Sequence, residues 1–305
     1  MLRSALLWGS ENEFLSRRLP RYWFVKRAVR RFMPGEEMDD ALKESAALGQ
    51  IGKGSILTLL GENVSQESEA SEVVQRYLDA LAAVESRSLD VEVSVKLTQL
   101  GLDLGEGMAE RNLRAVVEAS AKLGRLVWVD MEGSAYVDRT LDLYRAVRAD
   151  HDNVGICLQS YLRRTPEDLE TLLPLGAAVR LVKGAYAEPP EIAFPDKRDV
   201  DEAFFELASR LVEAGPPVRG AFGTHDEDLI RRIQAMGEER GVDPRVLEFQ
   251  MLYGIGVREQ DRLAADGFHL RVLISYGSAW FPWYMRRLAE RPANLTFVVR
   301  KMFSS

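Results

Sequence analysis

Eight short runs of apolar residues alternate along the chain with longer helical patterns, and this alternation restricts the fold more than any other feature of the sequence. Short runs rich in Val, Ile and Leu are typical of strands whose two faces are both buried, as in parallel sheets. The runs cover residues 55–60, 91–97, 126–131, 154–158, 177–183, 218–222, 246–252 and 269–274. The helical patterns between them cover residues 66–85, 106–123, 134–149, 166–173, 199–214, 226–240 and 257–266, and an eighth pattern follows the last run.

Strands that alternate with helices need crossover connections and therefore predict a parallel sheet. Eight strand–helix units are the number at which such a sheet closes, so we expect an α/β fold of the (β/α)8 TIM type. An open doubly wound sheet is the alternative, which is disfavoured because no G-x-G-x-x-G motif follows the first predicted strand. We expect residues 1–48 to form an N-terminal helical segment and residues 49–305 to form the barrel domain.

The composition is that of a soluble globular protein, because 46% of the 305 residues are hydrophobic and 29% are charged. The net charge of -7 argues against general nucleic-acid binding. The single cysteine, Cys157, excludes an intrachain disulfide and fits a reducing compartment. The sequence has no run of about eighteen apolar residues that could span a bilayer, and its first residues lack the apolar core of a signal peptide. A cytoplasmic location is therefore expected.

Residues 17–33, RRLPRYWFVKRAVRRFM, combine many basic residues with aromatic ones. A basic, aromatic helix can lie on an anionic membrane surface, so peripheral contact with the inner membrane is one interpretation. The other interpretation, which we favour, is a helix that packs its apolar face on the body of the protein and leaves its charges in water.

Polar side chains follow the predicted strands at the points where they end. In a barrel of this kind the chemistry takes place at the carboxyl ends of the strands. The residues at these ends are Glu62, Asn63, Lys96, Asp130, Met131, Glu132, Gln159, Arg180, Lys183, Thr224, His225, Asp226 and Gln250. Several of them are cations, which predicts a positively charged mouth that binds an anionic cofactor, an anionic substrate or both. The His, Asp and Glu residues show no metal-ligand spacing, so no metal is expected.

Two predicted strands carry charged residues among apolar ones. Lys96 should lie in the barrel mouth and pair with a carboxylate or an anionic ligand, and Asp130 on the next strand is the nearest candidate. A purely structural Lys–Asp pair is the alternative. Arg180 and Lys183 are three residues apart on one strand, so they should point to opposite sides of it. His225 begins a helix, where it is equally compatible with a structural hydrogen bond and with anion binding.

The last predicted helix, within residues 276–295, carries two adjacent arginines. Arg286 and Arg287 can converge on one carboxylate or phosphate, because each presents a planar fork of donors. Glu290 lies three and four residues further on, within reach of either guanidinium. An exposed helix with one weak ion pair is the alternative interpretation of this stretch.

Eight short motifs in this chain together resemble those of the proline dehydrogenase family, flavin-dependent enzymes that begin proline catabolism. In family order they are RFMPGE (31–36), LLGEN (59–63), SVKLTQLG (94–101), VDMEGS (129–134), RLVKGAY (180–186), THD (224–226), FQMLYG (249–254) and YGSAWFPWYMRRLAERPANL (276–295). RLVKGAY and the Arg-Arg-x-x-Glu helix are together the most specific part. The chain length resembles the monofunctional bacterial enzymes rather than the fused bifunctional ones.

The resemblance implies a distorted (β/α)8 barrel that holds FAD at the strand ends, with the last helix above the barrel mouth. The implied FAD-binding residues are Met131, Gln159, Arg180, Val182, Lys183, Gly184, Ala185, Thr224, His225 and Glu290. The implied reaction oxidises L-proline at ring carbon C5 to Δ1-pyrroline-5-carboxylate, and the cofactor carries out the redox chemistry. Electrons would pass to a quinone, and functional coupling to a pyrroline-5-carboxylate dehydrogenase is implied as well.

The resemblance also assigns residues to the substrate. Arg286 and Arg287 are implied to bind the proline carboxylate. The residues implied to line the substrate pocket are Lys96, Tyr186 and Leu252, and the implied catalytic residues are Asp130 and Arg180. A cation such as Arg180 near the flavin would stabilise its anionic reduced form. Glu62 is implied to pair with Arg287 as a gate that closes the site.

One position departs from the family pattern. The family usually carries a tyrosine on the eighth strand, three residues before the Tyr-Gly turn, where this chain has Leu273. Ser275 stands where a proline is common. Tyr276 could partly substitute for the missing ring, although its direction along the strand differs. A preference for hydroxyproline or another cyclic imino acid is therefore the alternative function.

Two further functions stay open at this point. A non-catalytic barrel would bind flavin or another anion without being reduced by any amine. An aldolase or isomerase on the same fold would be colourless, and Lys96 or Lys183 would form a Schiff base that borohydride traps.

Overall fold

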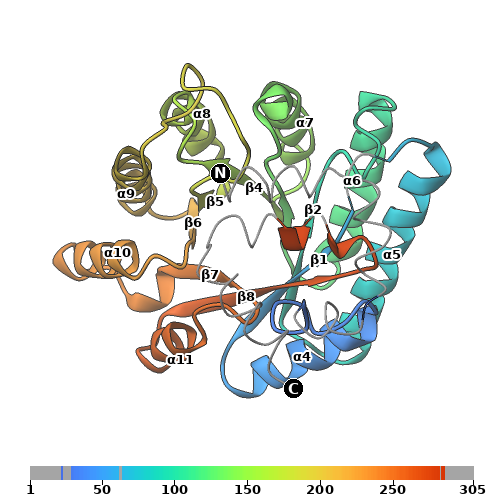
Figure 1. Ribbon diagram of the computed structural model, residues 1–305, viewed down its shortest axis with the longest axis horizontal. Coiled ribbons are helices and arrows are strands. Elements are labelled where there is room, and N and C mark those ends of the chain that lie inside the picture. The colour runs from blue at the N-terminus through green and yellow to red at the C-terminus, as the bar shows by residue number, and fades with distance from the viewer. Residues whose placement is uncertain (1–21, 23–28, 62–63, 282, 286–305) are drawn as a thin grey trace.

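The computed structural model describes residues 22, 29–61, 64–281 and 283–285. Its strands form one closed parallel barrel in chain order (Figure 1). The strands are β1 (Gly54–Leu59), β2 (Val91–Val95), β3 (Val127–Val129), β4 (Val154–Gln159), β5 (Ala178–Val182), β6 (Arg219–Gly223), β7 (Glu248–Leu252) and β8 (His269–Tyr276). The barrel closes between β1 and β8, which pair from Gly54 with Arg271 to Leu59 with Tyr276. The predicted α/β fold of the TIM type is confirmed.

Helices surround the barrel as a ring (Figure 1). They are α4 (Met38–Gln50), α5 (Glu67–Ser86), α6 (Glu106–Ala121), α7 (Val137–Arg148), α8 (Thr165–Leu172), α9 (Lys197–Ala214), α10 (Glu227–Glu239) and α11 (Val257–Ala265). Short 3-10 helices are η2 (Ser134–Tyr136), η3 (Leu173–Leu175) and η4 (Pro244–Val246). None of the helices within the described ranges is both long and apolar enough to cross a membrane.

Helix α4 covers the seam of the barrel. It precedes β1 in the chain and packs against both β1 and β8, and in Figure 1 it lies between α11 and α5. In a regular barrel this place belongs to the helix that follows the last strand. The chain after β8 can therefore take a different course, which is the distortion expected for this barrel.

The described start of the last helix lies at the carboxyl ends of the strands. Trp280, Phe281 and Tyr284 are buried there in a cluster with side chains from the N-terminal segment and from two strand-end loops. Leu60, which follows β1, and Ile255, which follows β7, pack against this cluster. The last helix thus begins above the barrel mouth, as expected.

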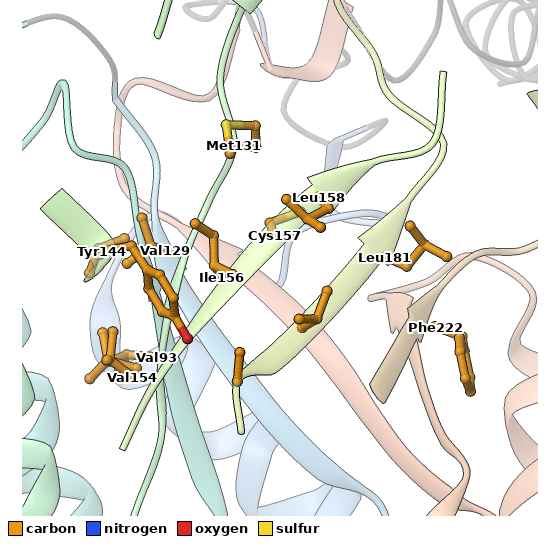
Figure 2. Close-up of a cluster of buried hydrophobic side chains, with 14 of the residues drawn as sticks. Val93, Val129, Met131, Tyr144, Val154, Ile156, Cys157, Leu158, Leu181 and Phe222 are labelled. Carbon is orange, nitrogen blue, oxygen red and sulfur yellow. The ribbon is translucent and has the colours of Figure 1, made fainter. Parts of the chain in front are cut away.

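The main hydrophobic core lies between the strands and the ring of helices. Aliphatic residues alternate along each strand, so every second side chain points outward into this layer. Figure 2 shows a part of it, in which Val129, Ile156 and Leu181 come from neighbouring strands and Tyr144 comes from α7. Tyr144 is fully buried. This layer fixes the outward face of each strand and thereby the residues that point into the barrel.

The interior of the barrel is unusually polar. Such barrels are commonly filled by layers of branched aliphatic side chains. Here the apolar filling includes Ile56, Trp128, Ala178 and Ala221. Charged and amide side chains share the interior with them, and those that are at least nine-tenths buried include Glu92, Gln159, Arg180, Glu248, Gln250 and Arg271. Buried charges need partners, so this interior must contain a network of ion pairs and hydrogen bonds.

The structure shortens several predicted strands at their ends. The third strand was predicted over residues 126–131 but covers Val127–Val129, because the chain turns at the barrel mouth from Asp130 onward. The Asp130 amide still donates to the Val95 carbonyl at 2.8 Å. The seventh strand was predicted from residue 246 but begins at Glu248, because Pro244 starts the 3-10 helix η4 just before it.

Candidate active site

A network of ion pairs surrounds Asp130 at the mouth of the barrel. Its carboxylate accepts hydrogen bonds from the Lys96 ammonium and from the Ser94 hydroxyl, each at 2.8 Å. The Arg180 guanidinium from β5 contacts the same carboxylate and also donates to the Ser94 hydroxyl oxygen at 2.7 Å. The Lys96–Asp130 pair predicted from the sequence is confirmed.

The two cations determine the ionisation of Asp130. Burial alone would raise the pKa of Asp130, but the Lys96 ammonium and the Arg180 guanidinium outweigh it and lower this pKa to about 2. Arg180 is itself only 3% exposed. Burial would lower the pKa of Arg180, whereas the nearby Asp130 carboxylate raises it. Asp130 is therefore a fixed negative charge at neutral pH and cannot accept a proton there.

Lys183 points away from this network. Its ammonium donates to Asp201 of α9 at 2.6 Å and to Asp226, the N-cap of α10, at 2.7 Å. Lys197 contacts the same two carboxylates. Burial would raise the pKa of Asp226, but the hydrogen bonds from the two lysines outweigh it and hold that pKa far below its ordinary value. The predicted opposite directions of Arg180 and Lys183 are confirmed, and the Lys183 ammonium is held by protein carboxylates.

His225 fixes the carboxyl end of β7. The Leu252 amide donates to His225 Nε2 at 2.8 Å, which requires this nitrogen to be unprotonated. Of the two roles left open by the sequence, the structure thus shows the structural hydrogen bond. Thr224, beside it, is buried and accepts a hydrogen bond from the Asp226 amide at 3.1 Å.

Gln159 ends β4 with an unsatisfied acceptor. Its amide nitrogen donates to the Met131 carbonyl at 3.3 Å, which joins the ends of β3 and β4. Its side-chain oxygen is buried and has no hydrogen-bond partner among the described residues. A buried acceptor without a partner is costly, so this atom is suited to a ligand that carries an N–H or O–H donor.

Gly184 allows the backbone to pass closely over Tyr161. Its φ is +111°, and a Cβ atom built on it would lie 2.2 Å from Cδ1 of the Tyr161 ring. The Tyr161 amide donates to the Lys183 carbonyl at 2.9 Å and holds the two segments together. A side chain at residue 184 would therefore disturb both the backbone and the ring beneath it.

The loop after β5 is anchored across the mouth. Val182, Ala185 and Tyr186 are half-buried along this stretch. Further along the loop, the Glu188 carboxylate accepts hydrogen bonds from the Ser134 amide at 2.7 Å and from the Ser134 hydroxyl at 2.6 Å. The loop is thereby fixed to η2, beside the end of β3.

Four predicted site residues lie outside the described part of the chain. They are Glu62, Arg286, Arg287 and Glu290. Their assignment to the carboxylate, the gate and the cofactor stays a prediction.

Tyr276 does not substitute for a ring at residue 273, in agreement with its different direction along the strand. Leu273 belongs to the barrel interior, where it packs against the cluster that contains Ile56 and Trp128. Tyr276 lies three residues further along β8, is 3% exposed and belongs to the outer core. Because side chains alternate along a strand, residues 273 and 276 point to opposite faces, and Tyr276 cannot reach the mouth from the inside.

Two residues that contact Arg180 were not predicted from the sequence. Ser94 accepts its hydrogen bond, and Trp128 places its ring centroid 5.2 Å from the guanidinium carbon. Residues two apart on a strand point to the same face. Ser94 precedes Lys96 by two residues and Trp128 precedes Asp130 by two, so this rule could have predicted that both point into the barrel.

Comparison with known proteins gives a consistent result. The sequence model of the proline dehydrogenase family matches residues 41–300. Proline dehydrogenase 1 of Bacillus subtilis subsp. natto is 37% identical over 300 residues, which are 98% of each chain. Proline dehydrogenase of Deinococcus radiodurans is 35% identical over 277 residues, 89% of each chain.

A solved structure shares the fold. Proline utilization A from Bdellovibrio bacteriovorus, crystallised after inactivation by N-propargylglycine, superimposes with a TM-score of 0.83 at 23% sequence identity. The match covers 100% of this chain and 38% of that longer one.

Proposed function

The chain belongs to the proline dehydrogenase family, and from this premise we propose that it oxidises L-proline to Δ1-pyrroline-5-carboxylate with bound FAD. The observation that carries the proposal is the arrangement of Lys96, Asp130 and Arg180 at the barrel mouth, which holds two cations where an anionic ligand would bind. The reaction removes two electrons and two protons from proline and leaves a C=N double bond in the ring. The flavin supplies the electron acceptor when it is bound.

The mouth of the barrel fits such a cofactor. The unpartnered oxygen of Gln159 suits a ring that carries an N–H donor, and Gly184 lets the backbone after β5 pack directly against the Tyr161 ring, which fixes the course of this loop at the mouth. The residues that we expect to hold FAD are Met131, Gln159, Arg180, Val182, Lys183, Gly184, Ala185, Thr224, His225 and Glu290. Because the Lys183 ammonium binds Asp201 and Asp226, we expect its backbone rather than its charge to face the cofactor.

The protein must orient the substrate and hold its carboxylate. We expect Arg286 and Arg287 to bind this carboxylate with their planar forks. The residues that we expect to line the remaining pocket are Lys96, Tyr186 and Leu252. Glu62 is proposed to pair with Arg287 and to close the site over the bound substrate.

The substrate amine must lose its proton before the ring is oxidised. Asp130 cannot take this proton at neutral pH, because the neighbouring cations keep its carboxylate ionised. We therefore propose that proline is oxidised from its neutral-amine form and that the proton leaves to solvent. The rate at low proline concentration should then rise with pH as the free amine deprotonates.

The electrons are proposed to continue to a quinone. Most of the basic residues 17–33 lie outside the described residues. Val29, Phe32 and Met33 of this segment pack into a buried cluster with the start of the last helix, as the favoured interpretation expects. We propose transient contact with the inner membrane, by an otherwise cytoplasmic protein, only for the basic residues that precede them. A liposome-flotation assay tests this contact, with arginines of that segment replaced by glutamine as the matched variant. Equal flotation of both proteins, or none, would exclude it.

The product is proposed to pass to a separate enzyme that oxidises it further. The solved neighbour is much longer than this chain, and another structure of this type is described as bifunctional proline utilization A. The oxidation of Δ1-pyrroline-5-carboxylate is a separate reaction, and functional coupling to a pyrroline-5-carboxylate dehydrogenase is our proposal for it.

The visible spectrum of the purified protein, recorded anaerobically before and after addition of L-proline, tests the proposed function. Flavin bands that bleach with proline are expected. A yellow protein that proline leaves unchanged would point to another substrate, and a colourless protein that takes up no added FAD would overturn the proposal.

A cyclic imino acid with a substituent on the ring is a second candidate substrate. Leu273 lies on the inner face of β8 in register with Leu252 of β7. The family resemblance places a larger, hydroxyl-bearing tyrosine at residue 273, so leucine changes both the space and the polarity there. Turnover of L-proline and of 4-hydroxyproline should be compared in the natural protein and in Leu273→Tyr. A strong preference for proline in both would exclude this second candidate.

A further inference from the structure

Trp128 places its ring against two guanidinium groups inside the barrel. The ring centroid is 5.2 Å from Cζ of Arg180 and 5.3 Å from Cζ of Arg219. The indole is fully buried, and Gly155 on the neighbouring strand leaves space for it, because a Cβ there would lie 2.8 Å from the ring. A guanidinium over an indole face is attracted by the negative electrostatic potential that the ring quadrupole creates there, and more strongly where water is excluded.

The polar edge of this indole is held as well. Trp128 Nε1 donates to Glu92 at 2.7 Å, and the other oxygen of Glu92 accepts from Nη1 of Arg219 at 2.9 Å. Glu92 is 3% exposed, so its charge depends on these donors. The ring therefore cannot turn without breaking a buried, charge-assisted hydrogen bond.

Gln250 holds Arg180 from β7. Its side-chain oxygen accepts from Nη1 of Arg180 at 3.4 Å, and its nitrogen donates to Glu248 at 2.7 Å. Glu248 in turn accepts from Nε of Arg219 at 2.8 Å. Arg219 is thus linked to Gln250 through Glu248 and to Trp128 through Glu92.

These contacts form a closed circuit, which we call the interior circuit. Its members in order are Arg180, Gln250, Glu248, Arg219, Glu92 and Trp128. It runs from the first residues of β6 and β7 to the barrel mouth. It contains two carboxylates and two guanidiniums, and Arg271 adds a third buried guanidinium 3.4 Å from Glu92. A connected network of buried hydrogen bonds and ion pairs can hold its members in one arrangement.

Asp130 and Ser94 do not fix Arg180 alone. Both contact the same nitrogen, Nη2, so the guanidinium could still turn about that point. Gln250 contacts the second terminal nitrogen, and Trp128 lies against the planar group. Contacts at three places on the guanidinium, made by residues of β2, of β3 and its end, and of β7, define the orientation of its plane.

We propose that Trp128 and Gln250 are positioning residues that aim the Arg180 guanidinium at the cofactor side of the mouth. The proposal rests on the proposed function, in which Arg180 faces the flavin. A charge that is oriented before the reaction stabilises developing negative charge without reorganisation at that moment. The interior circuit thereby links residues at the amino-terminal end of the barrel to the redox chemistry at its mouth.

The test compares three substitutions with a matched control. Trp128→Leu removes the ring, Trp128→Phe keeps a ring but loses the donor to Glu92, and Gln250→Leu removes the contact to Nη1. Phe249→Leu is the control, because Phe249 is equally buried on β7 but belongs to the outer core with Phe222 and Phe268.

Four measurements are made on each protein: kcat and KM for proline, the midpoint potential of the bound flavin, the free energy of unfolding, and the guanidinium resonances of 15N-arginine-labelled protein. The Arg180 resonance is assigned with Arg180→Lys. Trp128→Leu and Gln250→Leu are expected to lower kcat about tenfold with KM little changed, to make the potential more negative and to shift the Arg180 resonance. For Trp128→Phe, kcat, the potential and the shift of the Arg180 resonance should lie between those of the two leucine variants and those of the natural protein.

The control separates positioning from simple loss of packing. Phe249→Leu should destabilise the fold while the potential, kcat and the Arg180 resonance stay as in the natural protein. If Trp128→Leu and Gln250→Leu behave like this control, the positioning role is wrong. If Trp128→Leu does not fold, Gln250→Leu and Trp128→Phe still decide. If the natural protein takes up no FAD, the proposed function fails, and the arginine resonance still tests whether Trp128 and Gln250 hold Arg180.

Discussion

The Lys96 ammonium lies 2.8 Å from the Asp130 carboxylate, which also contacts the buried Arg180 guanidinium. One carboxylate thus serves two cations that come from β5 and from the end of β2. Removing it would leave both cations close together in a mostly buried place. Removing one partner of a buried ion pair lowers the free energy of unfolding by more than the intact pair contributes to it. We therefore expect the stability of the mouth to depend strongly on Asp130.

We predict that Asp130→Asn lowers the free energy of unfolding at pH 7 by about 3 kcal/mol. Urea unfolding measures this change. Asp142→Asn is the control, because Asp142 forms an exposed pair with Arg145 and its side chain is 77% exposed. The control should change stability by less than about 0.5 kcal/mol. A loss of similar size in both variants would show that the mouth network does not stabilise the fold.

The same pair predicts a pH dependence. The Asp130 pKa of about 2 in the folded protein lies below the ordinary value of 3.8, so the folded state favours the ionised form. The resulting stability is fully present above about pH 4 and is lost as the pH falls toward 2. The difference in unfolding free energy between the natural protein and Asp130→Asn should therefore shrink as the pH falls from about 4 to about 2. A difference that stays constant over this range would contradict the lowered pKa.

Gly184→Ala should weaken FAD binding and lower stability by about 2 kcal/mol, because the new Cβ meets the Tyr161 ring at a positive φ. Adding Tyr161→Ala removes the clash and should recover part of the loss, while the unfavourable φ remains. Gly215→Ala is the control: its φ is +57°, and a Cβ there meets nothing within 4 Å. Titration with FAD and thermal unfolding measure both effects. Equal FAD affinity in all four proteins would exclude a role of this backbone in the cofactor site.

His225→Leu should raise KM for proline or weaken FAD binding about tenfold, because it leaves the Leu252 amide without its acceptor at the end of β7. His225→Gln keeps an acceptor and should retain most of the natural behaviour. Steady-state kinetics with saturating FAD, together with FAD titration, separate the two effects. If glutamine and leucine are equally damaging, the hydrogen bond is not the reason for histidine at this place.

The sequence predicts the barrel and the Lys96–Asp130 pair because both follow from short-range rules. Eight apolar runs between helices define the strand order, and parallel neighbours bring Lys96 and Asp130 to the same edge. The partners of Lys183 were not predicted, since Asp201 and Asp226 belong to two helices whose relative placement depends on the packed structure. Alternation along β8 already indicated that Tyr276 and Leu273 point in different directions, and the structure places Tyr276 in the outer core.

The interior circuit shows the other limit of the sequence. Arg219, Glu248 and Glu92 stand at the starts of predicted strands, where charged residues usually face water. That they meet inside the barrel depends on its closure and on the relative register of β2, β6 and β7. Neither is visible in local patterns, so a network that reaches from these residues to Arg180 could be found only in the folded structure.

We predict that substitutions in the ion pair between Lys53 and Asp261 change the stability of the protein but not its activity. Lys53 precedes β1 and is 3% exposed, and its ammonium lies 2.5 Å from Asp261 of α11, whose side chain is 59% exposed. Asp261→Asn leaves a buried ammonium without its carboxylate and should lower the free energy of unfolding by about 2 kcal/mol, whereas Lys53→Met should be close to neutral or stabilising. In the Lys53→Met background, Asp261→Asn should then cost almost nothing, which a double-mutant cycle in urea measures. All of these variants should keep the natural kcat/KM, because the pair lies at the opposite end of β1 from the mouth. A loss of activity in the stable Lys53→Met protein would contradict this expectation. It would show that the amino-terminal end of the barrel influences the reaction by a route other than the interior circuit.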